Sequence, residues 1–181
     1  MIIVPAVPGT CGNQPKHADG YTCAEDKMLE KFFPDLTVDS IYDIEPEILL
    51  EKNIRGVILD IDNTLVAMHV RVADDKVVRW IERLKESGLK VCIVSNASKT
   101  RVDRFNEKLK VFAVHRASKP GSKGLLKASE YMGLGPEEVA VVGDQLFTDI
   151  YGGNRLNMFT VLVKPVDDRE VFFVRIKRLP V

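Results

Sequence analysis

The stretch "VILDIDNTLV", residues 57–66, decides the fold of this 181-residue chain. Its first three residues are apolar, and two of them are β-branched, which is typical of a strand buried on both faces. The strand is then interrupted by Asp60 and Asp62. In extended backbone, side chains two positions apart point to the same side, so both acids would face one place. A lone acid here would be an ordinary turn residue, whereas a pair favours a functional site.

Outward from this stretch, short β-branched runs alternate with amphipathic segments. This alternation predicts right-handed βαβ units, hence an α/β domain with a doubly wound parallel sheet of five strands. The strands are predicted at residues 54–61, 90–96, 111–116, 138–144 and 159–164. The helices between and after them are predicted at residues 74–87, 99–109, 121–133, 146–157 and 168–179.

The sequence divides into two parts. Residues 1–27 contain glycine, proline and asparagine without periodicity, and we expect them to form an irregular N-terminal extension. Residues 28–181 would form the single domain, in which residues 28–53 pack on the sheet as a further extension. A chain of this length has room for one sizeable core.

Composition restricts the partners and the compartment. There are 26 basic and 26 acidic residues, so no overall charge attracts nucleic acid, and none is expected as a partner. The three cysteines indicate a reducing compartment, and no apolar run reaches the roughly 18 residues of a membrane span. We therefore expect a cytoplasmic protein, with peripheral contact to a membrane surface left open. The oligomeric state is not predicted.

Polar residues collect where the predicted strands end. In an open α/β sheet, ligands bind beyond the carboxyl ends of the strands, so these side chains should meet at one edge. Each of them alone could be a turn or loop residue, but four separate segments contribute. They are Asp60 and Asp62, Ser95 and Asn96, Lys119, and Asp144, with Asp149 five residues further on.

This set of side chains suits phosphoryl transfer through a carboxylate. An aspartate can attack phosphorus to form an acyl-phosphate, which divides one difficult displacement into two easier ones. A second acid can protonate the leaving oxygen and later deprotonate water. Clustered carboxylates repel one another and the phosphate, and oxygen ligands favour Mg²⁺ as the compensating cofactor.

The same residues resemble the motifs of the haloacid dehalogenase (HAD) superfamily of aspartate-nucleophile phosphatases. "DIDNTL" resembles its first motif, and "IVSNAS", "SKP" and "VVGDQLFTD" resemble the second, third and fourth in the correct order. The DNTL and GDQ forms resemble the YqeG-type, subclass IIIA phosphatases, whose mitochondrial relatives dephosphorylate phosphatidylglycerophosphate. The resemblance covers residues 28–178 and implies a HAD-like Rossmannoid sheet with strand order 5-4-1-2-3.

The resemblance also implies a role for each residue. Asp60 would be the nucleophile and Asp62 the acid and base, with the Asp62 backbone carbonyl facing the metal. The implied Mg²⁺ ligands are Asp60, Asp62 and Asp144, and the implied phosphate-binding residues are Ser95, Asn96 and Lys119. Thr64 and Asp149 would support the site. Asp149 would either bind the metal directly or contact the residues that bind it.

The spacing of the motifs leaves no room for a cap domain. Only 33 positions separate Asp62 from Ser95, and 24 separate Ser95 from Lys119, enough for one helix and one strand each. An open site favours a phosphate on something large or anchored, and our leading hypothesis is a phosphatidylglycerophosphate-like lipid phosphomonoester. A phosphoprotein, a nucleotide, a nucleic-acid end, or a non-catalytic phosphate- or metal-binding module are the alternatives. The amphipathic residues 168–179 would either lie on an anionic bilayer or pack on the sheet.

Overall fold

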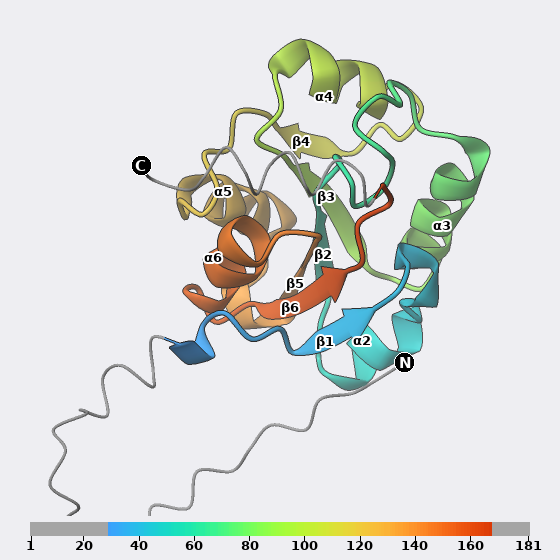
Figure 1. Ribbon diagram of the computed structural model, residues 1–181. Coiled ribbons are helices and arrows are strands. Elements are labelled where there is room, and N and C mark those ends of the chain that lie inside the picture. The colour runs from blue at the N-terminus through green and yellow to red at the C-terminus, as the bar shows by residue number, and fades with distance from the viewer. Residues whose placement is uncertain (1–28, 168–181) are drawn as a thin grey trace, which may run out of the picture.

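The computed structural model describes residues 29–167, whose strands form one all-parallel sheet of six strands in the order β1-β6-β5-β2-β3-β4 (Figure 1). The five predicted strands are all present, and their predicted order 5-4-1-2-3 is confirmed as β6-β5-β2-β3-β4. The bounds are β1 (Leu36–Val38), β2 (Gly56–Leu59), β3 (Lys90–Val94), β4 (Phe112–Val114), β5 (Val139–Gly143) and β6 (Phe159–Val163).

Two predictions lie outside the described residues. These are the irregular extension at residues 1–27 and the terminal helix at residues 168–179. The division of the chain into that extension and one domain over residues 28–181 therefore stays a prediction. Among the described residues, no helix is long and apolar enough to cross a membrane.

The expected number of strands was one too low. Residues 28–53 were expected only to pack on the sheet, but β1 within them pairs in parallel with β6, with Leu36 opposite Val161. The neighbouring Asp35 strengthens this edge, because its carboxylate accepts from the Thr160 backbone N–H at 2.8 Å. Three residues are too few for a periodic pattern, so the strand left no signal in the sequence.

The helices follow the predicted alternation. Their bounds are α2 (Pro46–Glu51), α3 (Asp75–Glu86), α4 (Lys99–Asn106), α5 (Lys123–Met132) and α6 (Tyr151–Asn154). Asp74 and Ser98 begin α3 and α4, where their side chains accept from the backbone N–H groups of Val77 and Arg101. The fourth predicted helix, residues 146–157, is divided into a π-helix, η3 (Leu146–Ile150), and the short α6.

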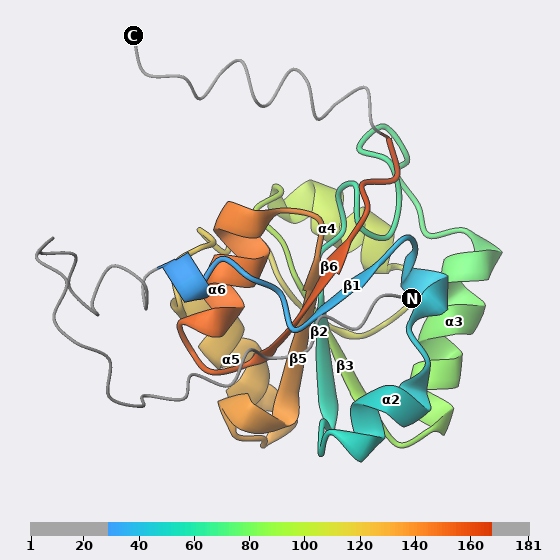
Figure 2. The ribbon, with the colours of Figure 1, turned by 60° about the horizontal axis from the view of Figure 1, so that its bottom comes forward.

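The sheet is covered on both faces, as a doubly wound fold requires. Figure 2 shows α5 and α6 on one side of the sheet and α2 and α3 on the other. Alternate residues of β2 enter the two cores: Val57 and Leu59 pack with residues of α2, α3 and α4, whereas Ile58 packs with residues of α5. The central strand is therefore buried on both faces, which explains its continuous apolar sequence.

Within residues 29–167, no separate cap domain covers the carboxyl edge of the sheet. The chain from Asp62 to Lys119, all of which the structure describes, contains only α3, β3, α4, β4 and their connections. The expected absence of an insertion between the motifs is thus observed for this part of the chain. Polar side chains at the strand ends consequently face an open cavity.

Candidate active site

Asp60 lies directly beyond β2, where its backbone N–H donates to the Val142 carbonyl of β5 at 3.0 Å. A tight turn follows, because the Ile61 carbonyl accepts from the N–H groups of residues 64–66 and Asn63 adopts a φ of +61°. Asparagine is one of the few residues that adopt this left-handed conformation readily. The turn holds Asp60 at the floor of the site, where its side chain is only 8% exposed.

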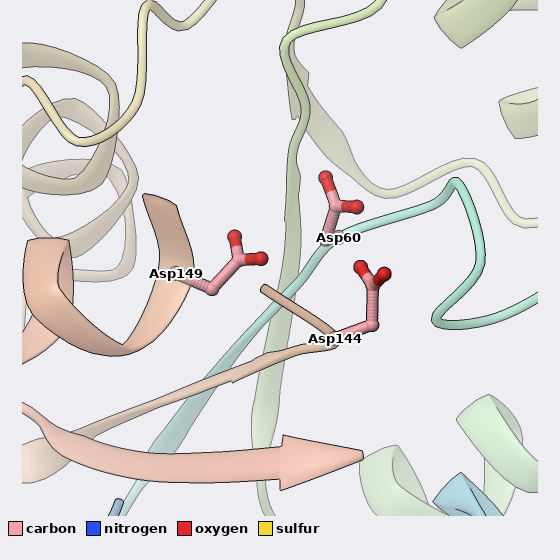
Figure 3. A group of neighbouring side chains, drawn as sticks. All are labelled: Asp60, Asp144 and Asp149. Atoms are coloured by element: carbon pink, nitrogen blue, oxygen red, sulfur yellow. The ribbon is translucent and has the colours of Figure 1, made fainter. Parts of the chain in front are cut away.

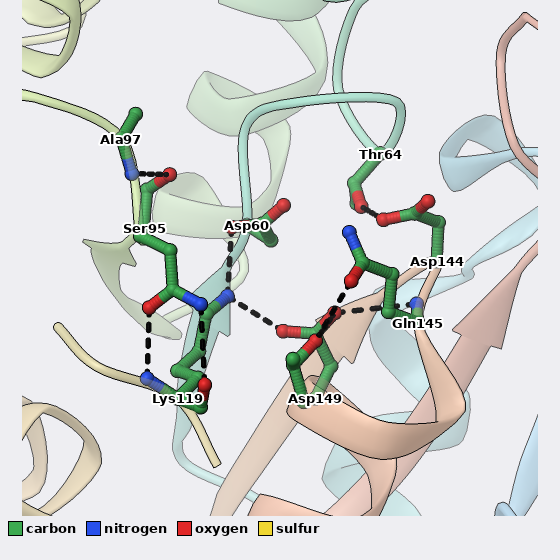
Figure 4. Close-up of polar contacts among 10 residues, drawn as sticks. Asp60, Thr64, Ser95, Ala97, Lys119, Asp144, Gln145 and Asp149 are labelled. Atoms are coloured by element: carbon green, nitrogen blue, oxygen red, sulfur yellow. Dashed lines mark hydrogen bonds and ion pairs between the residues drawn. The ribbon is translucent and has the colours of Figure 1, made fainter. Parts of the chain in front are cut away.

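Lys119 connects two of the predicted acids (Figure 4). Its Nζ lies 2.7 Å from Asp60 Oδ1 and 2.6 Å from Asp149 Oδ1, and its side chain is only 3% exposed. Burial alone would lower the pKa of Lys119, but the charges of Asp149 and Asp60 and their hydrogen bonds outweigh it, so the pKa lies above its ordinary value. The ammonium is therefore permanently charged beside the nucleophile candidate.

Asn96 fixes the backbone of Lys119. The Asn96 Oδ1 accepts from the Lys119 N–H at 2.8 Å, and the Asn96 Nδ2 donates to the Lys119 carbonyl at 3.2 Å. Ser95, which is buried, accepts at Oγ from the Ala97 N–H at 3.2 Å. The strand ends after β3 and β4 thus form one connected unit, as predicted from their positions in the sheet.

Three carboxylates meet in the site: Asp60, Asp144 and Asp149 (Figure 3). One oxygen of each lies within 4.8 Å of the others. Burial, together with the charges of Asp149 and Asp60, raises the pKa of Asp144 to about 7. The pKa of Asp149 is also raised, chiefly by burial, although Lys119 opposes the shift.

The carboxylate of Asp149 lies with those of Asp60 and Asp144. Asp62 was predicted to face the metal through its backbone carbonyl, so its side chain was not expected in this group. When all three carboxylates are ionised, the one ammonium of Lys119 leaves an excess of two negative charges. An all-oxygen donor set with this excess fits a divalent cation such as Mg²⁺. Thr64 contacts this group, because its Oγ1 donates to Asp144 Oδ1 at 3.2 Å, and its supporting role stays a prediction.

The position of Asp149 depends on a glycine. A Cβ at Gly143 would lie 2.3 Å from Asp149 Cγ, so the carboxylate packs directly over the end of β5. The Gln145 N–H and the Thr148 hydroxyl each donate to Asp149 Oδ2 at 3.3 Å. The π-helix η3 therefore presents Asp149 to the lysine rather than to solvent.

Asp62 is bound by an arginine that the sequence reasoning missed. Arg101 Nη2 and Nε lie 2.9 and 3.2 Å from Asp62 Oδ1. The only signal for this contact was the place of Arg101 in the first turn of the helix after "SNAS", close to the carboxyl edge. Asp62 also lines the same cavity as Asp60.

The cavity above these residues has a volume of about 650 Å³. Its polar part is lined by Asp60, Asp62, Asp144 and Lys119, with Ser95 and Asn96 beside them. Its walls include Met68, Leu146 and Phe147, three exposed apolar side chains that the motif reasoning did not identify. A polar floor below an apolar mouth therefore distinguishes this cavity.

The known proteins that this chain resembles in sequence are named as phosphatases, which agrees with the residues gathered in the site. A family model described as mitochondrial PGP phosphatase matches residues 23–167. The chain is 44% identical over 152 residues to the probable phosphatase YqeG of Bacillus subtilis, covering 83% of this chain and 88% of that protein. It is 32% identical over 158 residues to phosphatidylglycerophosphate phosphatase 1, chloroplastic/mitochondrial, of Arabidopsis thaliana, covering 81% of this chain and 45% of that protein.

Solved structures show the same fold at low sequence identity. An uncharacterized protein from Listeria monocytogenes aligns with a TM-score of 0.52 at 19% identity, over 71% of this chain and 86% of that one. A predicted HAD-like family hydrolase from Porphyromonas gingivalis aligns with a TM-score of 0.50 at 12% identity, over 70% of this chain and 99% of that one.

The fold, the site and these similarities define a phosphatase of the HAD superfamily. Within it, the chain belongs to the family described as mitochondrial PGP phosphatase, whose model matches most of its length.

Proposed function

We propose that the protein is a Mg²⁺-dependent phosphomonoester hydrolase that works through an aspartyl-phosphate on Asp60, with a phosphatidylglycerophosphate-like lipid as substrate. The observation that carries the proposal is the placement of Asp60 at the floor of an open cavity, in contact with Lys119 and beside Asp144 and Asp149. Such a site offers a nucleophile, a fixed positive charge and a set of oxygen ligands to one phosphate group.

The reaction has two halves. A carboxylate oxygen of Asp60 forms a bond to phosphorus while the bond from phosphorus to the leaving oxygen breaks, and Asp62 gives that oxygen its proton. Water then attacks the aspartyl-phosphate, Asp62 takes a proton from the water, and inorganic phosphate leaves with Asp60 restored. Asp62 loses its proton in the first half and regains one in the second, while Asp60 is phosphorylated and then freed, so the second half restores the starting enzyme.

The phosphate oxygens are held by the strand ends after β3 and β4. Lys119 supplies a fixed positive charge, and Ser95 and Asn96 lie beside it on the cavity wall. Groups that are already in place stabilise developing charge without reorganisation, which is why their rigid mutual hydrogen bonds favour catalysis.

Mg²⁺ would be held by Asp60, Asp144 and the backbone carbonyl of Asp62, with Asp149 beside them. Its presence would compensate the excess negative charge and hold the phosphate group near Asp60. Burial, together with the charges of Asp149 and Asp60, raises the pKa of Asp144, and a divalent cation bound there would favour the ionised carboxylate.

A lipid substrate is supported by two observations. The Arabidopsis relative is named as a phosphatidylglycerophosphate phosphatase. The exposed Met68, Leu146 and Phe147 at the mouth of the cavity would contact the glycerol backbone and acyl chains, while the phosphate reaches the polar floor. Peripheral contact with a membrane surface follows from the same apolar mouth.

Hydrolysis of p-nitrophenyl phosphate tests the chemistry. We expect activity with Mg²⁺, its loss in EDTA, and a fall of at least about 1,000-fold in Asp60→Asn, because the nucleophile is removed. Asp103→Asn, on the exposed surface of α4, is the matched control and should keep full activity. Equal rates in Asp60→Asn and wild type would refute the mechanism.

A substrate panel tests the lipid assignment. Phosphatidylglycerophosphate in mixed micelles should give a kcat/KM at least about tenfold above those of nucleotides and phosphopeptides, since only the lipid reaches both the polar floor and the apolar mouth. A preference for a nucleotide or phosphopeptide would overturn the lipid assignment and leave the aspartate chemistry intact.

A further inference from the structure

The Arg101 side chain makes contacts with three residues, and one of them is Asp62, the candidate acid and base. Its Nη2 and Nε donate to Asp62 Oδ1 at 2.9 and 3.2 Å, and its Nη1 donates to the Arg71 carbonyl at 3.3 Å. The guanidinium carbon lies 5.4 Å from the centre of the Phe105 ring. These contacts join α4 to the loop that carries Asp62.

This pair differs from an ordinary surface ion pair. The side chains of Arg101 and Asp62 are 16% and 24% exposed, whereas those of Lys99 and Asp103 on the same helix are 67% and 56% exposed. Exposed pairs contribute little to rigidity, but a mostly buried guanidinium with two bonds to one oxygen fixes the rotation of the carboxyl group.

We infer that Arg101 is a positioning residue that holds Asp62 in the orientation and tautomer needed for proton transfer, an inference that rests on the proposed function. A guanidinium only donates hydrogen bonds, so Asp62 Oδ1 must accept from it in either protonation state. The transferable proton is therefore carried by Oδ2. In the first half-reaction it passes from Oδ2 to the leaving oxygen while the bond from phosphorus to that oxygen breaks and the bond from Asp60 forms.

The placement of Arg101 also joins two functions in one element. Ser98, the N-cap of α4, accepts from the Arg101 N–H at 3.3 Å and comes two residues after Asn96 and three after Ser95. The segment that forms the phosphate-binding wall therefore also orients the proton donor. Proton transfer and phosphate binding are set by one rigid turn of the chain.

A leaving-group series distinguishes this role from a structural one. A proton donor matters most for poor leaving groups, so the kcat/KM of Arg101→Gln should fall about 10- to 100-fold for p-methoxyphenyl phosphate. For p-nitrophenyl phosphate, whose phenolate leaves without a proton, the fall should stay under about threefold. Arg104→Gln, exposed on the same helix, is the matched control, and Arg101→Lys should recover part of the loss because it restores one donor.

A double-mutant cycle shows whether Arg101 acts through Asp62. In an Asp62→Asn background, Arg101→Gln should change kcat/KM for p-methoxyphenyl phosphate by less than about twofold, because the group it positions no longer transfers a proton. An equal loss for both aryl phosphates, or a full additional loss in Asp62→Asn, overturns the inference. Failure of the proposed function is a separate result, seen as unchanged activity in Asp60→Asn.

Discussion

Replacing Lys119 by Met removes the ammonium between Asp60 and Asp149 and keeps a side chain of similar shape. Both ion pairs are short and buried. Removing one partner of a buried ion pair destabilises a protein by about 3–5 kcal/mol, since the remaining charge has no compensation. We therefore expect Lys119→Met to lose about 3–5 kcal/mol at pH 8 without Mg²⁺, or about 6–20 °C in Tm.

The loss should depend on pH. The charge of Lys119 lowers the pKa of Asp149, so its removal lets that pKa, already raised by burial, rise further. A carboxyl group with a raised pKa in the folded state binds its proton more tightly there, so it favours folding at low pH and loses this contribution as the pH rises to its folded pKa. At pH 5 the variant can protonate the acid, and we expect the loss to fall to about half or less.

Urea denaturation in EDTA at pH 5 and pH 8 measures the loss in the free energy of unfolding and its dependence on pH. Lys99→Met is the control, because Lys99 pairs with Asp103 on the surface and should contribute under about 0.5 kcal/mol. A loss below about 1 kcal/mol at pH 8, or an equal loss at both pH values, would show that the two ion pairs of Lys119 do not contribute the expected stability.

Three further predictions concern the same cavity. With a pKa of about 7 at Asp144, a proton competes with Mg²⁺ below that pH, so calorimetry should show the apparent Kd rising about tenfold per pH unit below 7; a constant Kd from pH 6 to 8 would contradict this. Gly143→Ala should cost about 1–3 kcal/mol and reduce kcat, because its Cβ displaces Asp149, whereas Gly152→Ala, with nothing closer than 3.5 Å, should be tolerated in thermal melts and assays. Phe147→Ser should lower hydrolysis of lipid phosphate in vesicles at least about fivefold further than hydrolysis of p-nitrophenyl phosphate, and equal losses would exclude an apolar contact with the lipid.

The central part of the fold was predictable because its strands are buried on both faces. β2 and β5 are apolar throughout, β3 is apolar after Lys90 and β6 is apolar except for Thr160, and the separation of these strands by amphipathic helices fixes a parallel sheet. β1 was missed because it has only three residues, buried, exposed and buried in turn, which are too few to form a recognisable pattern. The π-helix η3 was missed because its pattern is that of any helix.

The candidate site was predictable wherever a residue directly follows a strand. Asp60, Ser95 and Asp144 each come directly after the last residue of a strand, β2, β3 and β5 respectively. The end of that strand therefore places them at the carboxyl edge. The contact between Arg101 and Asp62 was not predictable, because it depends on the angle at which α4 leaves the sheet. The close approach of Asp149 to Lys119 depends likewise on the irregular turn of η3.

The two contacts of the Lys119 ammonium span 59 and 30 positions of the chain. The two partners of Lys119 lie on opposite sides of it in the sequence, because Asp60 follows β2 and Asp149 follows β5. The charge cluster can therefore assemble only once the central strands have found their register. The reactive centre is therefore a property of the assembled sheet rather than of any local element, and in refolding we expect phosphatase activity to appear only together with the native sheet.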